Sequence, residues 1–135
     1  MDCGLDTSAL MRIITTDPPE IARAVAKTLE GILSEGGTVH ISDMVVQEAY
    51  HALQFHYGAT KDNAIADLLA LAKTPGFRFS DGAKAALSQP NVARTSPGLV
   101  DRMIVADYSA QGLQTISCEK SFRRLPSAFV VNKPV

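Results

Sequence analysis

Hydrophobic and polar positions along the chain follow two periods in turn. Short apolar runs alternate with longer segments in which apolar residues recur every three or four positions, as on one face of a helix. The clearest helical stripe begins after Pro19, where Ile21, Val25 and Leu29 share one face. Strands that alternate with helices favour a mostly parallel sheet covered on both faces by helices.

The boundaries of these elements are marked by capping residues, prolines and glycines. Strands are expected just before Asp6 and at residues 38–41, 77–79, 113–118 and 128–131. Helices are expected after Asp6, from Pro19 to Gly36-Gly37, from Ser42 or Asp43 toward Tyr57, from Thr60 to Ala72, and at 83–87 and 99–111. Residues 89–98 read as the one long loop, 119–125 as a short turn or helix, and Pro134 as part of a frayed tail.

Composition is that of one ordinary globular domain spanning residues 1–135. The chain is 46% hydrophobic, 6% aromatic and free of Trp, which predicts a core of small aliphatic side chains. Its net charge of −1 excludes a global electrostatic footprint for nucleic acid. Any nucleic-acid binding must therefore be local or assisted by a metal.

The cysteines and the apolar runs indicate the cellular compartment. Cys3 and Cys118 are far apart, and we expect both to be small apolar fillers of strands. No apolar run has the length of a signal or membrane segment, so a reduced, cytoplasmic protein without a membrane partner is expected.

Four acids stand near the predicted ends of strands and helices. Asp6 follows the first strand and precedes the first helix, and for that stretch alone a simple helix cap is the plainer explanation. Glu48 lies within a helix and Asp101 opens one, so an exposed polar face and a cap are their default roles. Glu119 comes directly after the fourth strand. In open α/β sheets, sites form at the carboxyl ends of strands, and Asp6 and Glu119 both fall there.

Four blocks of sequence then resemble the PIN-domain family, in particular its small bacterial toxins of the VapC-like type. The blocks run in the family's order and cover nearly the whole chain. They are Leu5-Asp6-Thr7-Ser8-Ala9-Leu10, Val45-Val46-Gln47-Glu48-Ala49-Tyr50-His51-Ala52-Leu53, Val100-Asp101-Arg102-Met103-Ile104-Val105-Ala106, and Thr115-Ile116-Ser117-Cys118-Glu119-Lys120-Ser121-Phe122-Arg123-Arg124-Leu125-Pro126.

The resemblance implies a three-layer α/β/α sandwich with a five-stranded, mostly parallel sheet of order 3-2-1-4-5. It also implies metal-dependent cleavage of RNA, with an acidic cluster formed by Asp6, Glu48, Asp101 and Glu119. Thr7 and Ser117 match hydroxyl positions beside those acids. Family analogy further suggests a homodimer and a small antitoxin protein as partner, which would make this chain the toxin of the pair.

Elementary chemistry agrees with such a cluster. Carboxylates that lie close together repel one another unless a cation sits among them, and oxygen-only ligands select Mg²⁺ or Mn²⁺. We expect Asp6 and Asp101 to bind the metal directly, and Glu48 and Glu119 to hold its waters or a second ion. Arg12, Arg102 and Lys120 flank the acids and are candidates for phosphate contacts, with a solvated rim as the alternative.

Two departures from the family pattern leave a second hypothesis open. The family usually has Asp where this chain has Glu119, and often a further acid where it has Ser121. The alternative is therefore a weakened or inactive PIN module that binds RNA or protein.

Other kinds of site find less support in the sequence. His40, His51 and His56 lack a metal-ligand spacing. A haloacid-dehalogenase phosphatase is excluded because no second Asp stands two residues after Asp6.

Overall fold

The computed structural model describes residues 1–131 of the chain, which form two compact units, residues 1–80 and residues 81–131. The expected tail at Pro134 lies outside the described residues. That residues 1–135 act as one domain remains a prediction.

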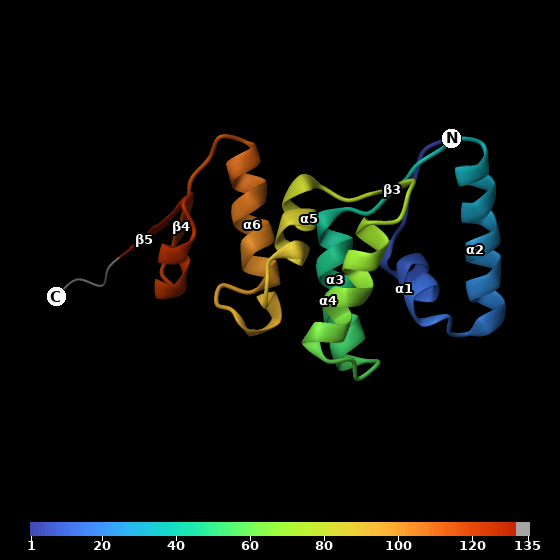
Figure 1. Ribbon diagram of the computed structural model, residues 1–135, viewed down its shortest axis with the longest axis horizontal. Helices are drawn as coiled ribbons and strands as arrows, with labels where there is room; N and C mark the ends of the chain where they lie inside the picture. The colour runs from blue at the N-terminus through green and yellow to red at the C-terminus, as the bar shows by residue number, and fades with distance from the viewer. Residues whose placement is uncertain (132–135) are drawn as a thin grey trace. The chain divides into compact units, whose positions relative to one another are not determined.

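The first unit is built from three short strands and four helices (Figure 1). In chain order they are β1 (Cys3–Gly4), α1 (Thr7–Thr15), α2 (Pro19–Ser34), β2 (Val39–His40), α3 (Asp43–Phe55), α4 (Lys61–Ala72) and β3 (Phe77–Arg78). The strands pair in parallel in the order β1-β2-β3, with Cys3 opposite Val39 and Val39 opposite Phe77. Helix α1 packs against α2 and α3, and α3 lies beside α4.

Three helices of this unit begin where the sequence places a cap. Asp6, Ser42 and Thr60 are the N-caps of α1, α3 and α4, and each side chain accepts a hydrogen bond from a backbone N–H in the first turn. Helix α2 has Pro19 at its first position, where a missing N–H costs nothing. It ends before Gly36, whose φ of 81° is readily accessible only to glycine.

A hydrogen-bonded group joins the starts of β1 and β2. The Asp2 carboxylate accepts hydrogen bonds from the Thr38 N–H at 2.9 Å and from the Thr38 hydroxyl at 2.8 Å. The same hydroxyl lies 2.9 Å from Nε2 of His40. These contacts lower the pKa of Asp2, chiefly through the Thr38 hydroxyl.

Aliphatic side chains from both pairs of helices fill the first unit. Leu10 of α1, Val39 of β2, Val46 of α3 and Leu68 of α4 have no exposed surface. Their burial explains why short strands suffice: the helices supply most of the apolar area.

The second unit contains α5 (Asp81–Ser88), η1 (Val92–Arg94), α6 (Leu99–Ala110), β4 (Thr115–Ser117), η2 (Lys120–Arg124) and β5 (Ala128–Val130). Strands β4 and β5 pair in parallel, with Ile116 opposite Phe129. Helices α5 and α6 pack closely, since a Cβ added at Gly82 would lie 2.7 Å from the Cβ of Ala106. Leu87, Leu99 and Met103 are buried in this unit.

Several sequence-based boundaries need correction. The fourth strand covers Thr115–Ser117 rather than residues 113–118. Cys118 is exposed beyond that strand, so its prediction as a strand filler was wrong, whereas Cys3 is half-buried in β1. Helix α5 starts earlier than expected, at Asp81, and the stretch 89–98 contains the short helix η1.

The predicted class is confirmed: the chain is a mixed α/β protein with parallel strands. The described strands form a three-stranded sheet and a two-stranded sheet rather than one hydrogen-bonded sheet of five strands, and the pairings within each sheet agree with the expected order 3-2-1-4-5. The step from strand 1 to strand 4 stays a prediction, because β1 and β4 belong to different units. Within residues 1–131, no helix is both long and apolar enough to cross a membrane.

Candidate active site

Asp6 is held at the N-terminus of α1 by two hydrogen bonds to the same oxygen. The Ala9 N–H and the Ser8 hydroxyl each donate to Oδ1 at 2.9 Å. Asp6 itself has an extended backbone, with φ −83° and ψ 175°, as an N-cap should. The simple capping role considered for this stretch is therefore present, and the side chain is exposed to solvent at the same time.

These contacts hold the Asp6 carboxyl group in its charged form. Its pKa is lowered from the ordinary value of 3.8, first by the hydrogen bond from the Ala9 N–H and next by that from the Ser8 hydroxyl. At neutral pH the group is an anion at the positive end of a helix dipole. Such a carboxylate can receive a cation without first losing a proton.

We expect Asp6 to make folding stability depend on pH in the acid range. Because its pKa is lower folded than unfolded, its contribution is complete above about 3.8 and is lost as pH falls through the lower folded value. Urea unfolding between pH 6 and pH 2.5 should thus show a steeper decline for the wild type than for Asp6→Asn. Parallel declines of the two proteins would show that these hydrogen bonds contribute nothing.

Glu48 reaches the same helix end from α3. The Thr7 hydroxyl, in the first position of α1, donates to Oε1 of Glu48 at 3.0 Å. Glu48 is exposed, as its default role on a polar helix face requires. Among the described residues it forms no ion pair, so a surface salt bridge is not its role here. Residues far apart in sequence thus meet: Thr7 stands next to Asp6 in the chain and holds the Glu48 carboxylate.

In the second unit, Asp101 occupies the third position of α6. It is half-buried in the first turn, and the N-cap, Gly98, offers no side chain to the free N–H groups. A carboxylate there is favoured by the helix dipole. The neighbouring Arg102 uses its Nε–H to donate to the Pro97 carbonyl at 2.8 Å, so that part of its guanidinium group supports the preceding loop.

Glu119 lies just past the carboxyl end of β4, at the start of η2. The Glu119 N–H donates to the Ser117 hydroxyl oxygen at 3.0 Å, which fixes the backbone at this turn. The side chain of Glu119 makes no capping hydrogen bond and is exposed, as is Lys120. Ser117 therefore positions the Glu119 backbone rather than its carboxylate.

The structure thus brings Asp6, Thr7 and Glu48 together in the first unit and supplies Asp101, with Ser117 and Glu119, from the second. Within residues 1–131, no group of three or more His, Cys, Asp or Glu side chains could hold a metal ion. Convergence of all four acids remains a prediction. The donors themselves are carboxylates and hydroxyls, and their oxygen chemistry fits Mg²⁺ or Mn²⁺.

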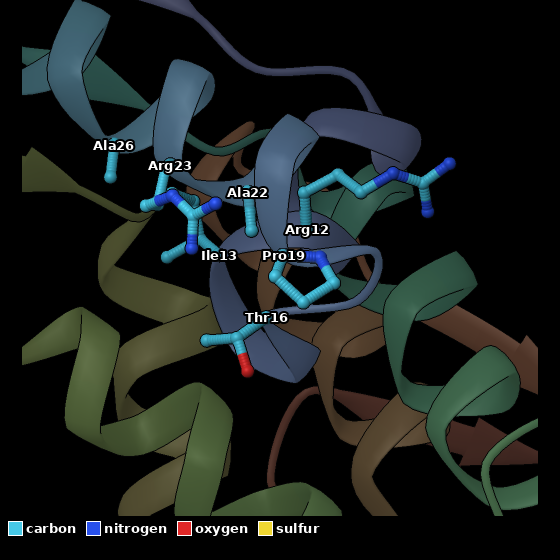
Figure 2. Close-up of a pocket in the computed structure, with 7 residues that line it drawn as sticks. All are labelled: Arg12, Ile13, Thr16, Pro19, Ala22, Arg23 and Ala26. Atoms are coloured by element: carbon cyan, nitrogen blue, oxygen red, sulfur yellow. The ribbon is translucent and has the colours of Figure 1, made fainter.

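Arg23 of α2 is a residue that the sequence analysis did not single out. It lines a pocket of about 330 Å³ between α1 and α2, together with Arg12 of α1 (Figure 2). The remaining lining residues are Ile13, Thr16, Pro19, Ala22 and Ala26. The short connection through Pro18-Pro19 was the available signal, because it folds α2 back onto α1 and brings the two arginines to one surface.

Each unit has a carboxylate just after a parallel strand, Asp6 after β1 and Glu119 after β4, and the carboxyl ends of strands are where sites form in α/β proteins. The family model described as "PIN domain" matches residues 4–128, so the chain belongs to the PIN-domain family. PIN domains are generally nucleases that use divalent metal ions. This membership confirms the family resemblance of the four sequence blocks.

No curated protein matches the chain. Among solved structures, VapBC2 from Rickettsia felis, bound to a DNA fragment from its promoter, is similar at a TM-score of 0.43 and 17% identity over 98% of each chain.

Proposed function

We propose that this protein is a divalent-metal-dependent ribonuclease whose site is formed by Asp6, Glu48, Asp101 and Glu119. The observation that carries the proposal is the Thr7–Glu48 hydrogen bond, which holds a second carboxylate at the helix end capped by Asp6. Membership of a family of nucleases supports the reaction class.

We assign a role to each of the four acids. Asp6 offers an ionised carboxylate whose Oδ1 is fixed by Ala9 and Ser8, and Asp101 offers a second carboxylate from a helix start. Glu48, oriented by Thr7, holds water or a second ion, and the longer Glu119 reaches the site through water. When bound, Mg²⁺ or Mn²⁺ would activate a water molecule and stabilise the charge that develops on the phosphoryl oxygens.

The biological role proposed is that of the toxin in a toxin–antitoxin pair, with RNA as the substrate. This part rests on the resemblance of the four sequence blocks to VapC-like toxins. With this role we propose a small antitoxin protein as partner, a homodimer as the active form, and action in the cytoplasm. A short reading frame beside the gene and the mass of the purified protein in solution would test the antitoxin and the dimer separately.

The direct test is cleavage of a mixed RNA pool by the wild-type protein with Mg²⁺, with Mn²⁺ and with a chelator, together with calorimetric titration of both ions. Metal binding with chelator-sensitive cleavage supports the proposal. Absence of both would favour the alternative, in which Glu119 and Ser121 mark an inactive PIN module that binds RNA or protein.

Removal of the Thr7 hydroxyl should weaken the site without unfolding the protein. Thr7→Val keeps the side-chain shape but releases Glu48, and losing such an orienting partner typically costs about 10- to 100-fold in metal affinity or activity. The measurement is the Mn²⁺ concentration that gives half-maximal cleavage. Thr28→Val is the matched control, because the Thr28 hydroxyl bonds only to the Ala24 carbonyl within α2. Equal behaviour of the two variants would remove Thr7 and Glu48 from the site.

A further inference from the structure

The pocket between α1 and α2 combines an apolar floor with two cationic side chains. Ile13, Pro19 and Ala22 supply apolar surface, and Arg12 and Arg23 stand at its rim (Figure 2). No acidic side chain lines the pocket, although Asp17 and Glu20 are near it in sequence. In a chain of net charge −1, this is a local concentration of positive charge.

Both guanidinium groups are available for a ligand. Within residues 1–131, neither Arg12 nor Arg23 forms an ion pair or a side-chain hydrogen bond. Arg12 is half-buried and Arg23 is exposed, so a ligand in solvent can reach both side chains. Arginine is suited to this task because its planar fork of donors matches the oxygens of a phosphate group.

The directions of the two side chains select the kind of anion. In Figure 2 the Arg12 guanidinium extends to one side of Pro19 and that of Arg23 lies on the other side, with Ala22 between them. Guanidinium groups that point to opposite sides of Ala22 suit a ligand with more than one anionic group. A strand with successive phosphates is such a ligand, and its base or ribose would then rest on the apolar side chains of the pocket.

Helical spacing relates the pocket to the proposed nuclease site. Arg12 lies one helical turn beyond Ser8, whose hydroxyl bonds to Asp6. Resting on the proposed function, we propose that Arg12 and Arg23 bind two backbone phosphates of single-stranded RNA beside the cleaved bond, and that the pocket between them receives the intervening nucleotide. These phosphate contacts would hold the RNA strand along α1 and would bind it independently of its base sequence.

The test is binding of a fluorescent single-stranded RNA 12-mer to the full chain by anisotropy, in a chelator so that no cleavage occurs. For Arg12→Gln/Arg23→Gln we expect affinity to fall about tenfold at roughly 0.1 M salt, and the salt slope to become less negative by about 1.4, or about 0.7 per lost phosphate contact. The matched control is Lys61→Gln/Lys73→Gln, which removes the same charge at the first residue and the C-cap of α4 and should leave both quantities unchanged.

Other outcomes would overturn the inference. Unchanged binding by the folded arginine variant would do so, as would equal loss in the lysine control, which would indicate a general charge effect. Arginine-dependent capture of an acidic peptide instead of RNA would assign the pocket to a protein partner, and binding of AMP as tightly as the 12-mer would exclude a strand.

Cleavage by the same proteins separates this inference from the proposed function. If the wild type binds RNA through the arginines but never cleaves it, the nuclease proposal fails, and the inference stands as an RNA-binding site without a cleaved bond beside it. If the wild type cleaves RNA and the arginine variant binds and cleaves equally well, the inference fails and the nuclease proposal stands.

Discussion

The Asp6→Asn variant is expected to lose divalent-metal binding and to cleave RNA about 100-fold or more slowly, while remaining folded. Asparagine caps helices as well as aspartate does, so its amide oxygen can still accept from the Ala9 N–H and the Ser8 hydroxyl. The substitution removes only the negative charge of the Asp6 carboxylate. Without this charged ligand the metal no longer binds, and the several kcal/mol by which it would stabilise the transition state are lost.

Calorimetry with Mn²⁺ and Mg²⁺, run beside cleavage of a mixed RNA pool, measures both effects. Asp2→Asn is the matched control: Asp2 is also an exposed aspartate whose pKa is lowered by an N–H and a hydroxyl, but it lies before β1 rather than after it. We expect that control to bind metal and cleave normally. Full metal binding by Asp6→Asn would show that this carboxylate is only a helix cap.

The Leu10→Ala variant is expected to have the largest effect on stability, lowering the free energy of unfolding by about 2–5 kcal/mol. Leu10 has no exposed surface and lies on α1, which packs against both α2 and α3. Its truncation therefore leaves a cavity where these helices meet, and the same helix carries Asp6 and Thr7.

Urea unfolding monitored by circular dichroism gives the measurement. Ile21→Ala on α2 is the comparison, because Ile21 is 49% exposed and its truncation should cost less than about 1 kcal/mol. If Leu10→Ala lowered the free energy of unfolding as little as Ile21→Ala, the core around Leu10 would have to relax to fill the space.

Local chemistry explains why the elements of the first unit could be predicted. Helix caps act within one turn, so Asp6, Ser42 and Thr60 mark helix starts in sequence as they do in space. The Pro19 start of α2 and the glycine after its end belong to the same class of signal. None of these depends on residues far away in the chain.

Tertiary contacts explain what could not be predicted from the residues alone. The bond from Thr7 to Glu48 joins residues 41 positions apart, and only the packing of α1 on α3 creates it. Arg23 carries no motif and gains its place beside Arg12 from the fold of the helix pair. Cys118 was wrongly predicted to fill a strand because β4 ends one residue earlier, at Ser117.

The contact between Asp2, Thr38 and His40 fixes the position of a proton. A threonine hydroxyl carries one hydrogen, and Thr38 gives it to the Asp2 carboxylate, which stays ionised because its pKa is lowered. The Thr38 oxygen can then only accept, so Nε2 of His40 must be the protonated nitrogen. This tautomer leaves Nδ1 as the sole lone pair of the neutral imidazole, and a metal could reach His40 only through that atom.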